Sequence, residues 1–201
     1  LVALGGLSLL GITPSYIISA PAVATGIGAK LLCSARCVSG FSEEQSFDDL
    51  VQYSAILDRL TVEYDEEAQR VTARFFGFAE KSSTFIPGVG CAIDYPDHSV
   101  RETLAEQVLP SQSDNSPWPL GDTVATIDAA VQREVDAVLA QDNAQGLNTR
   151  ALLVVKGGKI LGEAYAQGAD AQTPLLGWSM AKSLTAVMLA NLEHRGLLDL
   201  S

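Results

Sequence analysis

The feature that most constrains this chain is a pair of glycines set between two apolar runs near its C-terminal end. The runs ALLVV (151–155) and KILGEAY (159–165) lie on either side of Gly157-Gly158. Because two successive glycines accept the positive φ angles of a two-residue turn, this pattern predicts a β-hairpin. Two antiparallel strands are therefore fixed in sequence before anything else in the chain is assigned.

A helix is predicted directly before this hairpin. Asp122 or Thr123 is the expected N-cap, and the stretch from Asn143 to Gly146 is expected to end the helix. The polar residues Asp128, Arg133, Glu134 and Asp136 occupy the opposite face from a row of apolar residues. That apolar row, which follows the 3.6-residue period, consists of Val124, Ile127, Val131, Val135, Val138 and Leu139.

A second helix is predicted after the hairpin, over SMAKSLTAVMLANLEHRG (179–196). Its expected buried face consists of Leu184, Val187, Met188 and Leu192, and Gly196 is a good terminator. One hairpin with one helix on each side cannot close a sheet by itself. We therefore expect an α+β fold in which residues 122–201 form the N-terminal part of a domain that continues past Ser201.

The first 22 residues read as a truncated signal anchor or signal peptide. The stretch LVALGGLSLLGI is apolar, but its twelve residues are fewer than the roughly 20 that span a bilayer. Small residues follow, so cleavage after Ala20 or Ala22 is one interpretation, and an ordinary buried helix or strand is the other. We expect export, with membrane anchoring through the N-terminus as one form of it.

Three further segments separate this leader from the C-terminal domain. Residues 23–57 form a leader segment in which the acidic FSEEQSFDDL suits the start of a solvated helix. Residues 58–95 alternate β-formers (TVEYD, RVTARFFGFAE, KSSTFIP) and predict a small antiparallel meander that resembles a structural appendage. Residues 96–121, rich in Pro, Ser, Asp and Asn, are the predicted linker.

Charge and cysteine content exclude some partners. A net charge of −11 without a basic run excludes nucleic acid, which needs clustered Lys and Arg. Three cysteines and two scattered histidines do not form a zinc set, so we expect neither metal nor cofactor. In an exported chain, the cysteines predict one disulfide and one spare thiol. Cys33–Cys91 would tie the leader to the next module, Cys33–Cys37 would be tight, and three free thiols fit a reducing compartment.

The residues that carry chemistry are Ser179 and Lys182, at the start of the second helix. Three residues apart, they lie on one helical face, one turn removed. A serine hydroxyl becomes a nucleophile when an adjacent neutral amine takes its proton, and burial favours that neutral amine. The backbone N–H groups of a first turn favour developing negative charge. By spacing alone, however, a capping serine and a solvent-facing lysine are the simpler explanation of the pair.

The context of this pair resembles the serine β-lactamase-related family. Ser179-Met180-Ala181-Lys182 matches the family's Ser-x-x-Lys motif, and VVKGGKILGEAYAQG before it and GLLDLS after it match as well. The similarity covers about 50 residues, from about Leu152 to Ser201. The family includes class C β-lactamases, D-alanyl-D-alanine carboxypeptidases, esterases and 6-aminohexanoate-dimer hydrolases. The resemblance implies a β-lactamase/penicillin-binding-protein-like fold, an antiparallel sheet flanked by helices.

The resemblance also implies a function and a location. Ser179 would be the nucleophile and Lys182 the general base in acyl transfer on an amide, ester or β-lactam carbonyl of a small molecule or peptide. The upstream segments look like the leader of membrane-anchored members in the bacterial envelope, periplasmic or attached to the inner membrane. In those members, cysteines corresponding to Cys33 and Cys91 would form a disulfide, so Cys37 would be an unpaired cysteine.

Two motifs of the family cannot be assigned in this chain. None of the five tyrosines has Asn two places later, so the Tyr-x-Asn motif is missing. Lys156-Gly157-Gly158 and His194-Arg195-Gly196 match a Lys/His-x-Gly strand only superficially. The family places this strand far downstream of the serine, and neither segment lies there. We therefore expect negligible turnover from these 201 residues alone and activity from a longer parent. The alternatives are a weak or inactive penicillin-binding or sensor module, and a structural envelope protein.

Overall fold

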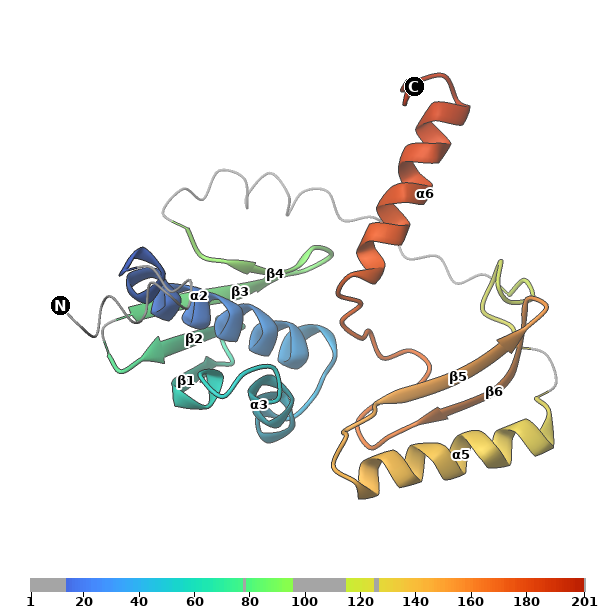
Figure 1. Ribbon diagram of the computed structural model, residues 1–201, viewed down its shortest axis with the longest axis horizontal. Coiled ribbons are helices and arrows are strands. Elements are labelled where there is room, and N and C mark those ends of the chain that lie inside the picture. The colour runs from blue at the N-terminus through green and yellow to red at the C-terminus, as the bar shows by residue number, and fades with distance from the viewer. Residues whose placement is uncertain (1–13, 78, 96–114, 125–126, 201) are drawn as a thin grey trace.

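The structure, a computed structural model, describes residues 14–77, 79–95, 115–124 and 127–200. It is α+β, with antiparallel strands and helices packed on them. Two groups of elements follow each other along the chain: α2 to β4 first, then α5 to α6 (Figure 1). The stretch LVALGGLSLLGI and most of the predicted linker, residues 96–114, lie outside the described residues.

An antiparallel meander forms the sheet of the first group. Its strands pair in chain order, with Leu60 opposite Phe75 and Ser83 opposite Ile93. The alternation of β-formers predicted such a meander over 58–95. The strands are β1 (Leu60–Asp65), β2 (Arg70–Phe75), β3 (Ala79–Ile86) and β4 (Gly90–Ile93).

The helix α2 (Pro14–Cys33) lies across this sheet and continues into a π-helical turn, η1 (Ser34–Val38). The boundary predicted between residues 22 and 23 falls inside α2, which runs unbroken through it; beyond the boundary the helix packs on the sheet, and Ala24 and Leu32 are buried. Among the helices that the structure describes, none combines the length and apolarity needed to cross a membrane.

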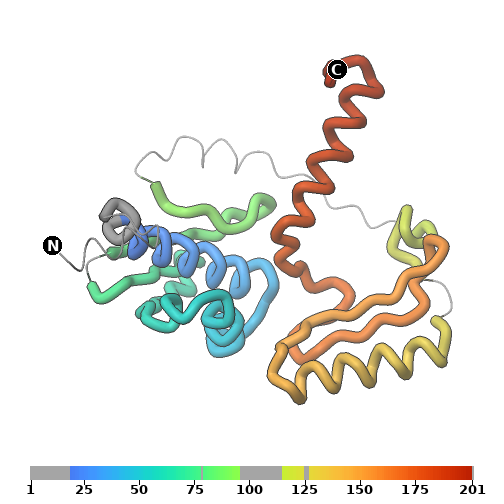
Figure 2. Tube along the Cα trace, viewed as in Figure 1, coloured from blue at the N-terminus to red at the C-terminus, as the bar shows by residue number. Residues whose placement is uncertain are grey.

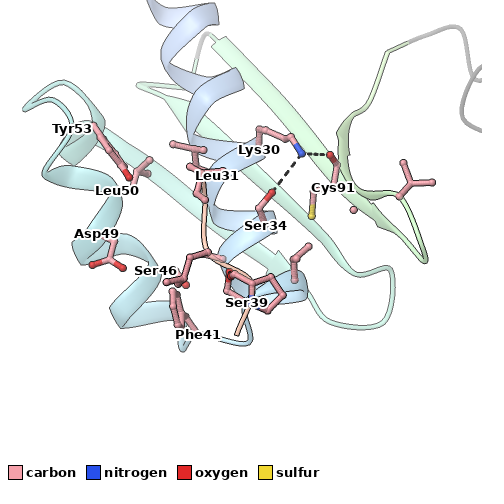
Figure 3. A pocket seen from close by; sticks show the side chains of 17 residues that line it. Lys30, Leu31, Ser34, Ser39, Phe41, Ser46, Asp49, Leu50, Tyr53 and Cys91 are labelled. Carbon is pink, nitrogen blue, oxygen red and sulfur yellow. Dashed lines mark hydrogen bonds between the residues drawn. The ribbon is translucent and has the colours of Figure 1, made fainter. Parts of the chain in front are cut away.

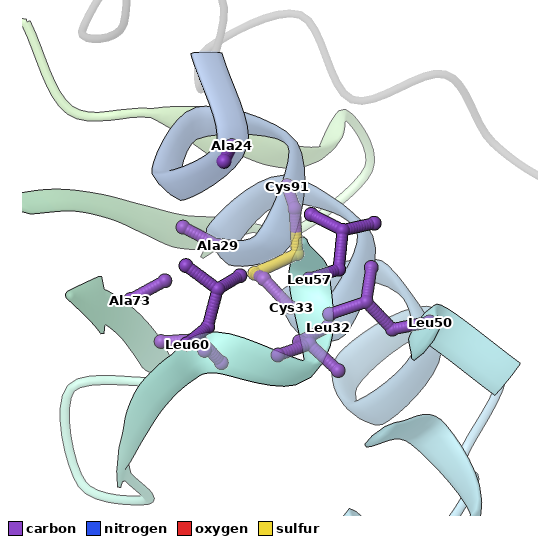
Figure 4. Packing of buried hydrophobic residues seen from close by; sticks show 10 residues of the cluster. Ala24, Ala29, Leu32, Cys33, Leu50, Leu57, Leu60, Ala73 and Cys91 are labelled. Carbon is purple, nitrogen blue, oxygen red and sulfur yellow. A yellow bond between two sulfur atoms is a disulfide. The ribbon is translucent and has the colours of Figure 1, made fainter. Parts of the chain in front are cut away.

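Small residues on α2 let the helix approach the sheet closely. Gly28 faces Leu60 and Ala73 with no room for a side chain, and Ala29 is completely buried. Leu32 and Leu50 fill the space between α2 and α3 (Glu43–Val51), as Figure 4 shows. Interiors of this kind are close-packed, so a single added methyl group is felt.

The acidic start of α3 agrees with the prediction for FSEEQSFDDL. Ser42 is its N-cap, and the Ser42 hydroxyl accepts a hydrogen bond from the Gln45 N–H at 3.1 Å. Glu43 and Glu44 occupy the first turn, where the partial positive charge of the helix favours them. After α3, the short 3₁₀ turn η2 (Leu57–Arg59) leads into β1.

The predicted hairpin is confirmed. β5 (Ala151–Lys156) and β6 (Lys159–Tyr165) pair antiparallel, with Gly157 at φ 58° and Gly158 at φ 70°. The helix α5 (Ala129–Ala144) covers one face of this hairpin (Figure 1). A Cβ on Gly162 would lie 3.2 Å from both Val131 and Val135, so the glycine permits this close packing.

The predicted start of α5 was wrong by about six residues. Neither Asp122 nor Thr123 caps the helix; Asp128 does, and its carboxylate accepts from the N–H of Ala130 at 2.8 Å and of Val131 at 3.1 Å. The Asp128 N–H donates to Leu161 O, which fixes the cap residue beside β6. Of the predicted apolar face, Val135 and Leu139 are buried, whereas Val124 precedes the helix and is exposed.

Polar contacts join the two groups of elements. Arg150, just before β5, forms an ion pair with Asp49 of α3 at 2.5 Å, and its guanidinium lies over the Phe41 ring. Gln45 donates to Gln167 O, and Ser39 donates to Pro174 O at 2.7 Å. The segment that leads from β6 to α6, traced in Figure 2, is thereby held against the end of α2 and α3.

Candidate active site

Ser179 stands immediately before α6 (Met180–His194), as the spacing predicted. It is the N-cap residue, but its hydroxyl makes no capping hydrogen bond. The simple interpretation of Ser179 as a helix cap therefore lacks the contact that defines one. Its hydroxyl is available for another role.

Lys182 lies one turn further along the helix and meets this hydroxyl. Lys182 Nζ donates to Ser179 Oγ at 3.1 Å, within hydrogen-bond distance for proton transfer. The two residues that the motif singled out are thus brought together. Both side chains are exposed, however, so among the described residues nothing supplies the shielding that we expected around the pair.

The expected buried face of α6 was also wrong. Leu184, Val187 and Met188 are 63%, 66% and 60% exposed, and the described helix has no buried residue. The reason is that α6 extends away from both sheets (Figure 1). Apolar residues nonetheless occur on all its sides, and helices of that kind are normally buried. They are Met180, Ala181, Leu184, Ala186, Val187, Met188, Leu189, Ala190 and Leu192.

The backbone around Ser179 has an uncommon conformation. Trp178 has a φ of 42°, in the left-handed region that bulky residues rarely adopt. Within the described part of the chain, the Ser179 N–H donates to no oxygen, whereas the Met180 N–H is bonded to Gly177 O. Strained residues cluster at functional sites, and a free N–H at a serine is suited to stabilising an oxyanion if that serine attacks a carbonyl.

Tyr53 is a contact of this site that sequence reasoning missed. Its ring lies edge-on to the Trp178 indole, with centroids 5.3 Å apart, and its hydroxyl accepts a hydrogen bond from Trp178 Nε1 at 3.3 Å. Tyr53 follows α3, and no local pattern links it to a residue 125 positions away. The loop before Ser179 is therefore held by the N-terminal group of elements.

The superficial matches to a Lys/His-x-Gly motif are placed as the sequence analysis argued. Lys156 is the last residue of β5, and Gly157 and Gly158 form the hairpin turn. His194 ends α6, and Gly196, with a φ of 67°, terminates the helix. Neither segment provides a strand beside Ser179.

The cysteines form one disulfide and one free thiol. Cys33 at the end of α2 is bonded to Cys91 of β4, and Cys37 is free and partly exposed. The three sulfur atoms lie within 4.8 Å of one another. Because two of them are joined covalently, the cluster does not offer three thiolates to a metal.

Comparison of the chain with protein-family models, with curated proteins and with solved structures finds no match. The interpretation of the site therefore rests on its own geometry and on the sequence context of Ser179 and Lys182.

Proposed function

We propose that this chain carries the nucleophile of a serine hydrolase of the β-lactamase-related type. The observation that carries the proposal is the 3.1 Å contact between Lys182 Nζ and Ser179 Oγ at the start of an apolar helix. The conformation of Trp178, the uncapped Ser179 hydroxyl and the free Ser179 N–H support it.

The proposed reaction proceeds through an acyl-enzyme. Ser179 Oγ attacks the carbonyl carbon of an amide, ester or β-lactam while its proton passes to Lys182, and the Ser179 N–H faces the resulting oxyanion. The leaving amine or alcohol takes that proton as the tetrahedral intermediate collapses. Water then attacks the ester, releasing a carboxylic acid and restoring the serine hydroxyl.

This chemistry requires a drier environment than the described residues give the pair. Because α6 is apolar on all sides, we propose that further protein covers it in the active enzyme, as the rest of a β-lactamase-like domain would. That protein would also contribute the Tyr-x-Asn and Lys/His-x-Gly motifs. We expect the 201 residues alone to show negligible turnover, and a rate equal to that of a longer chain would contradict this expectation.

The alternative is a module that binds or slowly acylates without turnover, such as a penicillin-binding sensor. The exposure of both Ser179 and Lys182 favours this alternative, since nothing in the described part of the chain shields the pair from water. Substrates in both cases are small-molecule or peptide amides and esters. We propose the bacterial cell envelope as the location, since a disulfide persists in an oxidising compartment.

An active-site serine probe tests the proposal on the full-length protein. A fluorophosphonate or a fluorescent penicillin should label it once, at Ser179, and Ser179→Ala should abolish the label. Lys182→Ala should slow labelling by about 100-fold or more, the usual scale of general base catalysis. Ser183→Ala and Lys159→Ala, which remove a neighbouring hydroxyl and a distant amine, should label normally. Labelling that survives Ser179→Ala would refute the proposed nucleophile.

Hydrolysis separates the enzyme from the sensor. A full-length protein that releases its acyl group and turns over many times is the proposed enzyme. One that stops after a single equivalent at Ser179 is the binding module. If Lys182→Ala changes neither the labelling rate nor the hydrolysis rate of the full-length protein, the protein is neither the enzyme nor the binding module. Ser179 is then a residue of a structural envelope protein.

A further inference from the structure

A cavity of about 290 Å³ lies between the N-terminal group of elements and the segment that leads to Ser179. The end of α2, α3 and the start of β4 line it (Figure 3), and Pro174, Leu175 and Leu176 complete the lining. This volume is at the lower end of that of small-molecule sites, about 300–1,000 Å³. Its apolar lining includes Leu31, Val38, Phe41, Leu50, Val89 and Leu175.

Lys30 brings a positive charge to this apolar lining. Its amine donates to the carbonyl oxygen of Cys91 and to Ser34 Oγ at 3.5 Å (Figure 3). No carboxylate of the residues that the structure describes forms an ion pair with Lys30. Burial lowers the pKa of Lys30, which is the mark of a cation without a compensating anion.

The acidic residue on the cavity wall does not supply that anion. Asp49 is bound to Arg150, with Oδ1 at 2.5 Å from Nη2 and Oδ2 at 3.3 Å from Nε. The Asp49 charge is thus already balanced by Arg150 and does not neutralise Lys30. The cavity therefore suits one negative charge, placed at Lys30.

We propose that this cavity binds a single-chain amphiphile that ends in a carboxylate. One carboxylate oxygen accepts a hydrogen bond from Lys30 and the other from the Ser34 hydroxyl, while an alkyl chain of about eight to ten carbons lies on the apolar walls. A singly charged head group matches the single unbalanced cation, which favours a carboxylate over a phosphate dianion. The site assigns a function to Lys30 that the serine chemistry does not use.

Occupation of the cavity is expected to be felt at Trp178. Tyr53 lines the cavity and contacts the Trp178 indole. The lining segment from Pro174 to Leu176 comes just before Trp178 in the chain. Trp178 therefore offers an optical signal for binding. The chain contains one other tryptophan, Trp118, so Trp118→Phe leaves Trp178 as the single reporter.

The test is a titration of the Trp118→Phe protein with sodium decanoate, well below its micelle concentration. Trp178 fluorescence and calorimetry should both show saturable binding of one decanoate per chain. Decanol and decyltrimethylammonium, which keep the chain but remove or reverse the charge, should bind at least tenfold more weakly. Decyl phosphate should also bind more weakly than decanoate, and the opposite order would overturn the choice of a carboxylate head.

Two variants test the roles of head group and chain. Lys30→Met should weaken decanoate binding at least tenfold and leave decanol binding unchanged, whereas Lys81→Met, on β3 outside the cavity, should change neither. Leu175→Asp places a charge on the apolar wall at a residue that is 44% exposed, so it should fold normally and lose decanoate binding. Equal affinities for decanoate and decanol, or unchanged binding in Lys30→Met, would overturn the proposal.

The result is separate from the outcome for the serine. Ser179→Ala should bind decanoate with the same affinity as the parent, because Ser179 does not line the cavity. A protein that binds decanoate but takes no serine probe would retain this site and lose the proposed hydrolase function. A protein that takes the serine probe but does not bind decanoate would retain the proposed hydrolase function and lose this site.

Discussion

The indole of Trp178 lies edge-on against the phenol ring of Tyr53, 5.3 Å from centroid to centroid, and donates a hydrogen bond to its hydroxyl. This contact joins the residue just before the proposed nucleophile to the end of α3. Since Trp178 is held at a positive φ, the contact helps to keep an uncommon backbone conformation in place.

Removing the Tyr53 ring is therefore expected to loosen the loop before Ser179. Tyr53→Ala should change the emission of Trp178 in a Trp118→Phe background and slow probe labelling of the full-length protein several-fold. Tyr53→Phe keeps the ring contact and loses only the hydrogen bond, so its effects should be smaller. Both rings are more than half exposed, so the loss of stability should stay below about 1.5 kcal/mol. An unchanged Trp178 spectrum in Tyr53→Ala would show that the contact is absent in solution.

The disulfide is expected to be the strongest single constraint on the N-terminal group. It closes a loop of 58 residues between α2 and β4, and the chain-entropy relation gives about 4 kcal/mol for a loop of that size. Cys91→Ser should lower the free energy of unfolding in urea by about 2 to 5 kcal/mol. Cys37→Ser, which leaves the bridge intact, is the matched control and should cost much less. Similar losses in the two variants would contradict this pairing.

Cys37 is expected to react slowly at neutral pH. Burial raises the pKa of its thiol, so the reactive thiolate is scarcer than in an ordinary cysteine and increases only as the pH rises further. Alkylation by iodoacetamide should be slower in the native protein than in urea at pH 8, and the difference should narrow towards pH 10. Mass spectrometry of the alkylated peptides measures both rates.

The same experiment reports on disulfide exchange. The Cys37 sulfur lies within 4.8 Å of both sulfurs of the bridge, so its thiolate can attack either one. Peptide maps should show new pairings that involve Cys37 in the same alkaline range, and none near pH 6.

In the alkylation experiment, a faster reaction of Cys37 in the native state than in urea would refute the raised pKa of its thiol.

The Asp128 cap is expected to make the stability of α5 depend on acid. Hydrogen bonds from the N–H groups of Val131 and Ala130 lower the pKa of Asp128. Its contribution is therefore complete above the unfolded-state pKa of an aspartate and is lost as the pH falls through the lower folded-state value. Asp128→Ala should reduce thermal stability at pH 7, whereas Asp128→Asn, which caps equally well but does not titrate, should retain it.

The comparison between the parent protein and Asp128→Asn carries the test. Between pH 5 and pH 2, the parent should lose stability relative to Asp128→Asn, as followed by circular dichroism. A constant difference between these two proteins across that range would show that the carboxylate does not titrate with folding.

The sequence determined those features that depend on neighbours along the chain. Gly157 and Gly158 specified the hairpin because few other residues accept two positive φ angles, and alternating β-formers specified the meander of 58–95. The spacing of Ser179 and Lys182 specified their contact, since residues three apart share a helical face. Local geometry was sufficient in each case.

Only the tertiary structure decided what depends on distant contacts. The choice of Cys91 over Cys37 as the partner of Cys33, and the pairing of Tyr53 with Trp178, follow from how α2 and α3 pack on the sheet. The start of α5 moved to Asp128 because Leu161 of β6 binds that residue's N–H. The expected burial of α6 failed for a related reason: periodicity shows that a helix is apolar, but burial depends on what packs against it.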